Sequence, residues 1–341
     1  MPTSSSQPEV SVAPNQGRRG ISLRKVVEIE GATVLAALFL LVVFSSIFAP
    51  RFLTPDNLTN VLVQSVFVVI LGIGMTFVLV SGGIDLSVGS TMGLSAAVTI
   101  YSINHGVPVA VALLIGLASG AAVGFFNSYF ITALKMADFI VTLGTLSLVR
   151  GIVELMTANT RLNTQSPAFG FLASGTVLGV LPTAVLIAAV VVVVGALALA
   201  KAPLGRVIYA VGLNPASSYL AGVRVQRVRV GVYVTSGVLA ALTGILLASR
   251  LTSAHPALGT GYELTAIAAA AIGGTSLAGG RGSVLGTVLG ALLLGVLQNA
   301  LSLLQINAFW FQIITGLMIV AAVLLDEAIR RMLRARPSSA Q

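Results

Sequence analysis

The sequence predicts an all-α, polytopic membrane protein of about ten transmembrane helices, some of them short or broken. Three observations indicate this class: strongly apolar residues make up 56% of the 341 positions, charged residues only 9%, and long apolar runs recur along the whole chain. A soluble domain has about 25% charged residues, so this chain could not cover a water-facing surface. A soluble enzyme, a disordered protein and a nucleic-acid binder are therefore excluded, although the net charge is +9.

Eight apolar runs are long enough for helices that cross a bilayer, which need about 20 residues. They are residues 32–49, 60–80, 107–130, 139–157, 181–200, 231–249, 283–304 and 308–325. Together they define a transmembrane domain over residues 31–327. The polar segment 1–30 predicts a disordered cytoplasmic tail, and residues 328–341 predict a basic cytoplasmic tail.

Two further apolar segments, residues 91–103 and 263–272, are short. As helices they would reach only about 20 Å and 15 Å. Each adjoins a glycine-rich stretch, so each is either a tilted or broken span or a half-helix supported by its neighbours.

The distribution of basic residues favours ten crossings with both termini in the cytoplasm. Lysine and arginine concentrate in cytoplasmic loops. With ten crossings, most of the 19 basic residues fall inside, and only Arg51, Arg161 and Arg250 fall outside. Omitting both short segments would invert the middle of the chain and move the basic residues after Ala200 to the outer face.

The first glycine-rich break follows the apolar run 60–80. Gly82 and Gly83 are suited to end a helix, and Asp85 or Ser87 could cap the helix that follows. The break is either a hinge or substrate-path element, or an ordinary capped turn. A second break at Gly273, Gly274 and Thr275 weakly repeats the first, as expected of duplicated transporter halves.

The polar stretch 201–229 is the longest interior loop. Asn214 is a good N-cap, Pro215 suits the first helical position, and Gly222 supplies a stop after about two turns over residues 216–221. This short helix is either a docking site for a soluble partner or a surface helix without a partner.

Three charged residues fall within or beside apolar segments. Arg150 and Glu154 lie four positions apart, so they could pair on one helix face, either structurally or along a substrate path. Glu263 begins the segment 263–272, where a carboxylate favours the positive end of the helix dipole. Capping is the interpretation we prefer for Glu263.

The inventory of reactive residues argues against an enzyme. Cysteine is absent, no lysine follows glycine in a phosphate-binding loop, and the two histidines form no zinc motif. We therefore expect no catalytic residue, metal or cofactor on this chain.

Several segments resemble the permease subunits of bacterial ribose-type ABC sugar importers. The matching stretches are residues 82–89, 139–144 with Arg150 and Gly151, 205–222, 272–282 and 294–299 through Asp326, in order over about residues 30–330. The resemblance makes residues 201–229 the coupling loop that meets the ATPase. Its coupling residues would be Gly205, Arg206, Gly212, Asn214, Pro215 and Gly222.

The resemblance also implies the missing parts of a transporter in the bacterial cytoplasmic membrane. ATP and magnesium would bind a separate cytoplasmic ATPase subunit, a sugar-binding protein would deliver substrate outside, and a second permease chain would complete the pore. The alternative function is an ion-gradient-driven secondary transporter. That function would need a titratable carboxylate deep in a span, whereas Glu154 and Asp85 lie towards span ends.

Overall fold

The computed structural model describes residues 23–334 apart from residues 178 and 180. The predicted tail 1–30 is thus described only from residue 23, where a helix begins, and the predicted tail 328–341 only to residue 334, where a helix ends. The helices are α1 (Leu23–Phe48), α2 (Pro55–Val80), α3 (Val88–Asn104), α4 (Val109–Thr132), α5 (Asp138–Thr157), α6 (Pro167–Ser174), α7 (Thr183–Ala200), α8 (Pro203–Leu213), α9 (Pro215–Leu220), α10 (Val225–Leu251), α11 (Tyr262–Ile272), α12 (Val284–Leu303) and α13 (Phe309–Arg334).

Two pairs of very short strands complete the described chain. Strand β1 (Leu162–Asn163) pairs antiparallel with β4 (Ser253–Ala254), and β2 (Thr176–Val177) pairs antiparallel with β3 (Leu181–Pro182). The predicted start of one span at residue 181 therefore belongs to β3, and α7 begins two residues later, after the proline.

All ten segments predicted from hydrophobicity are helical. Within the described part of the chain, six helices are long and apolar enough to cross a membrane: α2, α4, α5, α7, α10 and α12. Shorter apolar stretches lie in α1, α8, α11 and α13. The protein is therefore a multi-pass membrane protein, and its ten crossings stay a prediction.

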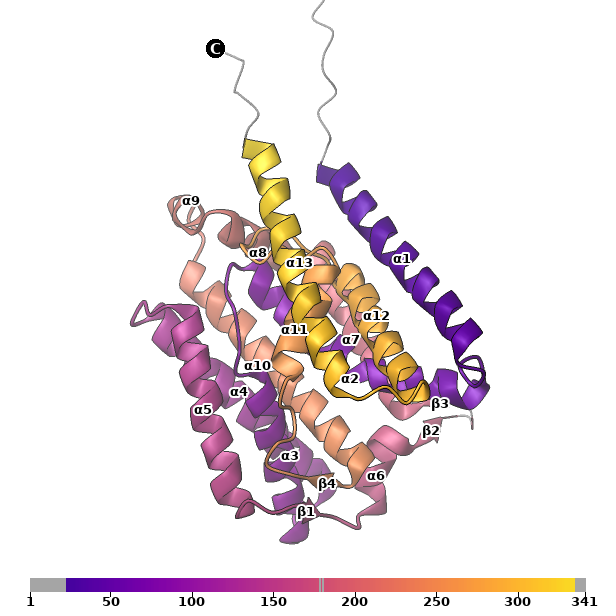
Figure 1. Ribbon diagram of the computed structural model, residues 1–341. Helices are drawn as coiled ribbons and strands as arrows, with labels where there is room; N and C mark the ends of the chain where they lie inside the picture. Colours follow the sequence, from indigo (N-terminus) through magenta and orange to yellow (C-terminus); the bar gives the residue numbers. More distant parts are fainter. Residues whose placement is uncertain (1–22, 178, 180, 335–341) are drawn as a thin grey trace, which may run out of the picture.

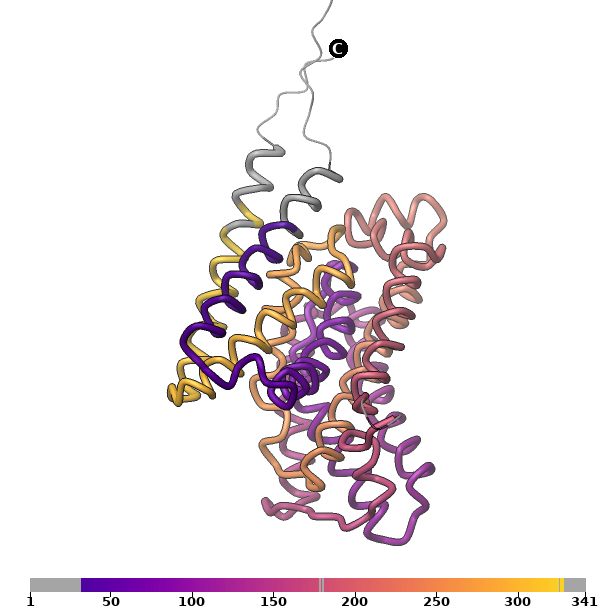
Figure 2. Tube along the Cα trace, turned by 90° about the vertical axis from the view of Figure 1, so that its right-hand side faces the viewer, coloured from indigo at the N-terminus to yellow at the C-terminus, as the bar shows by residue number. Residues whose placement is uncertain are grey.

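Helix α2 forms the centre of the bundle. Its most apolar window is 89% buried within the chain, against 28% or less for α4, α5 and α7. It packs on α10, α12, α11 and α7. Figures 1 and 2 show α2 enclosed by these helices, with α5 on one flank and α1 on the other. The outer helices leave their apolar side chains exposed, as a lipid-facing surface requires.

The two ends of the bundle differ. Helices α8 and α9, the start of α1 and the end of α13 gather at one end, and β1, β4 and α6 lie at the other (Figure 1). We refer to these as the loop end and the strand end. The described chain thus starts and finishes at the same end of the bundle, as an even number of crossings requires.

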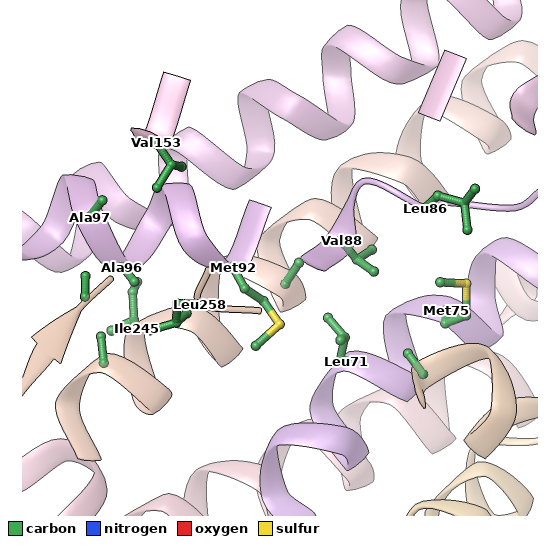
Figure 3. Close-up of a cluster of buried hydrophobic side chains, with 14 of the residues drawn as sticks. Leu71, Met75, Leu86, Val88, Met92, Ala96, Ala97, Val153, Ile245 and Leu258 are labelled. Atoms are coloured by element: carbon green, nitrogen blue, oxygen red, sulfur yellow. The ribbon is translucent and has the colours of Figure 1, made fainter. Parts of the chain in front are cut away.

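A buried apolar cluster joins the central helices to α3 and α5. Met92 of α3 points towards Leu71 of α2, with Leu258 next to Ala96 and Ile245 on the other side of Met92 (Figure 3). Elsewhere the backbones themselves come close: a Cβ on Gly120 of α4 would overlap the carbonyl oxygen of Gly237 in α10. Such small residues let helices pack tightly where burial of apolar surface gives little driving force.

Candidate functional site

The first helix break, residues 81–87, begins with a Schellman turn at the loop end of α2. Gly82 adopts φ of +83°, and its N–H donates to the carbonyl of Leu79 while the Gly83 N–H donates to Val78. This pair of hydrogen bonds satisfies the last carbonyls of the helix, and the left-handed residue is cheapest as glycine. The predicted helix end is confirmed.

The second helix break, residues 273–283, begins with the same turn after α11. Gly274 adopts φ of +84°, its N–H donates to Ala271, and the Thr275 N–H donates to Ala270. The repeat noted in the sequence is thus a repeat of backbone geometry at the ends of two helices. The side-chain hydroxyl of Thr275 is buried and has no hydrogen-bond partner.

The predicted coupling loop, residues 201–229, contains two helices, α8 and α9, rather than one. Helix α9 matches the prediction: the Asn214 side chain accepts a hydrogen bond from the Ser217 N–H at 3.0 Å, Pro215 is the first helical residue, and Gly222 closes the helix at φ of +83°. Helix α8 was not predicted, because the whole stretch was interpreted as a polar loop; its buried residues Gly205, Ile208 and Val211 nevertheless recur at helical spacing.

The short helix α9 presents apolar side chains outwards. Tyr219 and Leu220 are 73% and 86% exposed, and Leu213, directly before Asn214, is 70% exposed. Arg206 on α8 is exposed as well, whereas Gly205 is buried and a Cβ there would overlap the carbonyl oxygen of Leu199. An apolar tip of this kind is suited to contact another protein.

The end of α8 contacts both helix breaks at one point, which we call the glycine junction. A Cβ on Gly212 would overlap the carbonyl oxygen of Val80, the last residue of α2. That same carbonyl accepts a hydrogen bond from the Gly280 N–H at 2.9 Å. A Cβ on Gly279 would lie 2.9 Å from the Cα of Gly82. Three backbone segments far apart in sequence therefore meet without intervening side chains.

A tyrosine of α8 fixes the junction to the second break. The Tyr209 hydroxyl donates to the carbonyl of Gly282 at 2.7 Å. Burial raises the pKa of Tyr209, so the hydroxyl keeps the proton that it donates. The second break is also held by α13, where Asp326 accepts from Arg281 at 2.6 Å and from the Ser276 hydroxyl at 3.0 Å.

Asp85 lies in the buried interior of the first break. Its side chain is 1% exposed and accepts hydrogen bonds from the Ser87 N–H, the Ser87 hydroxyl and the Ser236 hydroxyl, at 3.0, 2.6 and 3.0 Å. Asn127 of α4 donates to the Ser87 hydroxyl at 2.8 Å. The carboxylate thus ties the break to α10 and, through Ser87, to α4.

The predicted capping of α3 by a side chain is wrong. Ser87 does occupy the N-cap position, but its side chain makes no capping hydrogen bond, because its hydroxyl is held by Asp85 and Asn127. Asp85 accepts from the Ser87 N–H rather than from a first-turn N–H of the helix.

Arg150 and Glu154 make no hydrogen bond with each other, although their charges still attract, and Glu263 attracts Arg150 more strongly. The Arg150 guanidinium donates to the carbonyls of Pro256 and Leu258 at 2.6 and 3.0 Å, and Glu154 is exposed on a shallow hollow with Gly151 and Asn159. The acceptors of Arg150 are backbone carbonyls in the loop before α11. The spacing of Arg150 and Glu154 on one helix gave no information about that loop.

Glu263 lies in the first turn of α11, as predicted. One of its carboxylate oxygens accepts from the Gly261 N–H at 3.1 Å, and Gly261 is the N-cap residue of that helix. The other oxygen is buried without a hydrogen-bond partner, against Gly89 of α3. A capping interaction is therefore present at Glu263.

Sequence reasoning missed Asp138 and Tyr233, which also contact the first break. Asp138 begins α5, and Tyr233 lies one turn before Ser236 in α10. Asp138 could have been found from the sequence, because it directly precedes an apolar run. Nothing in the sequence distinguished Tyr233 from other residues of its helix. Within the described residues, no group of three or more His, Asp or Glu could hold a metal ion.

The fold and these sites define a class of protein, the polytopic membrane permease. A family profile described as a permease component of branched-chain amino acid transport systems matches residues 57–323. The ribose import permease proteins RbsC of Escherichia coli and Bacillus subtilis are 41% and 42% identical, over 86% and 85% of this chain and 92% and 90% of their own lengths. The D-allose transport system permease protein AlsC of Escherichia coli is 36% identical over 85% of this chain and 89% of its own length. No solved structure matches the chain.

The chain belongs to this family of transport-system permease components. The resemblance to permease subunits of ribose-type ABC sugar importers, drawn from the residues alone, is confirmed.

Proposed function

We propose that this permease forms the pore of an ATP-driven importer that carries a monosaccharide or a related small polyol across the cytoplasmic membrane. One observation carries the proposal: the relatives named for ribose and allose transport match the chain over 85% or more of its length, so the likeness extends over most of the transmembrane region. A permease of this kind hydrolyses no ATP itself. ATP and magnesium belong to the partner ATPase.

The proposed topology has ten crossings, with the loop end in the cytoplasm. Both described chain ends lie at the loop end, together with α8 and α9 (Figure 1). His105 and His255 then lie outside, next to the turns that start α4 and precede α11. Reporter fusions at these two positions should give an extracytoplasmic signal, and a cytoplasmic signal at either would contradict the topology.

The proposed coupling route runs from α9 to the helix breaks. The exposed tip of Leu213, Tyr219 and Leu220 would seat in the ATPase, and α8 would transmit its displacement to the glycine junction. The junction touches the end of α2 and residues Gly279 and Gly280 of the second break at once, so a single movement would shift both breaks. Coupling requires that ATP binding favour one of two arrangements of these segments.

The remaining partners follow from this function. A solute-binding protein delivers the sugar at the strand end, and a second permease chain, identical or closely related, completes the pore. The exposed apolar faces of α4, α5 and α7 supply surface for both lipid and a second chain.

Reconstitution tests the function. Proteoliposomes that contain the chain, its ATPase and its binding protein should take up radiolabelled ribose or allose only when ATP is present on the side of the membrane that carries the ATPase. Uptake driven by a proton or sodium gradient without ATP would establish the secondary transporter instead.

A substitution at the α9 tip tests the coupling route. Leu220→Asp should leave the chain folded in the membrane, because the side chain is 86% exposed, but should abolish ATPase binding in pull-down and ATP-driven uptake. Leu134→Asp is the matched control, since Leu134 is 53% exposed on the turn between α4 and α5. Normal uptake by Leu220→Asp would refute docking through α9. Deletion of residues 214–222 should give the same uncoupling.

A further inference from the structure

Three side chains from α5 and α10 converge on the backbone of the first helix break. They are Asp138, Arg229 and Tyr233, which we call the break latch. None of them belongs to the glycine junction, which lies on the other side of the Gly82 turn. The latch therefore offers a second connection between the coupling loop and the break.

Tyr233 is the centre of the latch. It is fully buried, and its hydroxyl lies 2.9 Å from the Asp138 carboxylate and 3.3 Å from the carbonyl oxygen of Ile84. A hydroxyl has one proton, so the two acceptors share it, and the shorter contact to the charged acceptor is the stronger one. The longer contact to Ile84 is the one that a small displacement would break.

Gly83 has no side chain, and this lets the latch residues approach the backbone of the break. A Cβ on Gly83 would lie 2.5 Å from the Tyr233 hydroxyl and 2.7 Å from the Asp138 carboxylate. The Thr142 hydroxyl of α5 shares its one proton between the carbonyls of Asp138, at 2.9 Å, and Ile84, at 3.2 Å. The carbonyl of Ile84 thus lies within hydrogen-bonding distance of hydroxyls from two different helices, and both are also bound to Asp138.

Arg229 completes the latch only loosely. Its guanidinium lies 3.7 Å from the Asp138 carboxylate, beyond hydrogen-bonding distance, although both side chains are largely buried. The Nε atom of Arg229 is buried and has no hydrogen-bond partner. A buried guanidinium donor without an acceptor is costly. If the guanidinium of Arg229 moved to within hydrogen-bonding distance of the Asp138 carboxylate, its unpaired N–H donor could be satisfied.

The position of Arg229 connects the latch to the coupling loop. It lies in the second turn of α10, only nine residues after the end of α9. A displacement of α9 therefore reaches Arg229 through a short, structured link. If Arg229 closes onto Oδ1 of Asp138, it draws the carboxylate towards itself, and the Tyr233 hydroxyl stays bound to the other oxygen, Oδ2. The hydroxyl then moves with the carboxylate, and its longer contact to the carbonyl of Ile84 is lost.

We propose that the break latch is a set of positioning residues for coupled transport: Arg229 moves with α9, changes its contact with Asp138, and thereby sets whether Tyr233 holds or releases the backbone of the first helix break. The inference rests on the proposed function, because it presupposes an ATPase that moves α9.

Stoichiometry of transport is the first test. Tyr233→Phe removes only the hydroxyl. In proteoliposomes with ATPase and binding protein, ribose or allose uptake per ATP hydrolysed should fall about fivefold or more, the lower range of coupling effects between sites. ATP hydrolysis itself should persist. Tyr129→Phe is the matched control, since Tyr129 of α4 is 50% exposed.

The arginine is tested in the same assay. Arg229→Gln should lower uptake per ATP as Tyr233→Phe does, and Arg229→Lys should restore part of it by keeping the charge. Arg227→Gln, two residues earlier and exposed, should leave the ratio unchanged. A proportional loss of uptake and hydrolysis in the latch variants, or no loss, would overturn the latch.

A thiol probe reports on the break without any sugar. The chain has no cysteine, so Thr142→Cys introduces a single buried thiol against Ile84. In the complex with the ATPase, maleimide labelling of this thiol should accelerate when ATP and vanadate are added. With Tyr233→Phe it should be fast in both states. A labelling rate that does not change when ATP and vanadate are added would overturn the latch. A nucleotide-dependent labelling rate in a complex that transports neither ribose nor allose would overturn only the proposed sugar class.

Discussion

The two helix breaks share one local geometry and have different surroundings. Gly82 and Gly274 take nearly the same φ, +83° and +84°, and each closes a helix by the same pair of backbone hydrogen bonds. Beyond the turn, the first break runs into the interior, where Asp85 is 1% exposed. The second is held at a partly exposed ion pair of Arg281 and Asp326, whose side chains are each 18% exposed.

The comparison shows that a short sequence determines the geometry of the turn, whereas the surrounding helices determine the hydrogen-bond partners of the residues after it. A glycine pair after an apolar run is sufficient for the turn. The partners of the next residues come from α4, α5 and α10 at the first break and from α8 and α13 at the second. Each break has an arginine–aspartate pair of similar exposure, but the pair is close only at the second break, 2.6 Å against 3.7 Å. The first break is thus held mainly by hydrogen bonds from neutral donors, and the second by a charged donor as well. Four tests probe this contrast.

The largest effect is expected where the two breaks meet. Gly212→Val would drive a side chain into the carbonyl of Val80, which also accepts the Gly280 N–H, and should cost about 3 kcal/mol of stability. Thermal unfolding in detergent would measure it. Gly231→Val is the control, because no atom lies within 4 Å of a Cβ there. Equal unfolding temperatures for the two variants would contradict the close approach at the junction.

A smaller loss is expected at the buried carboxylate of the first break. Asp85→Ala leaves the Ser87 and Ser236 donors without an acceptor and should destabilise the chain by about 2 kcal/mol. Asp85→Asn, which keeps an acceptor oxygen, should lose less. The same unfolding assay ranks the three chains, and a neutral Asp85→Ala would show that the network contributes nothing to stability.

The turns themselves should respond alike. Gly82→Ala and Gly274→Ala each force a residue with a Cβ into the left-handed region, at a cost of about 1 kcal/mol. Because the local geometry is shared, the two losses should agree. A much larger loss at Gly82 would mean that the shared turn is not the governing factor there.

The smallest effect belongs to the ion pair of the second break. Arg281→Gln should cost at most about 1 kcal/mol, because a partly exposed pair is screened and gains little. Any loss should shrink at high salt. Unfolding midpoints at low and high salt measure this, and a salt-independent loss would contradict a mainly electrostatic contact.

Most of the helices could be predicted from the sequence, because apolar runs and glycine ends are local signals. The helix α9, with its Asn214 cap and Gly222 stop, was predictable for the same reason. Helix α8 and the strands β1–β4 were not predicted. Each strand has only two residues, and the apolar residues of α8, although spaced as in an amphipathic helix, lie in a stretch whose basic residues favoured a loop. Arg150 shows the limit for side chains: its position suggested Glu154, but carbonyl groups more than 100 residues away bind it.

The sequence by itself determined the membrane class, most of the apolar helices, the two glycine breaks and the family resemblance, because hydrophobicity, backbone freedom and motif order are properties of neighbouring residues. Only the tertiary structure decided that Gly212 lies on both breaks, that Asp85 binds Ser236, and that Tyr233 reaches Ile84. These contacts join positions far apart along the chain, and they exist only because helix packing brings their backbones together.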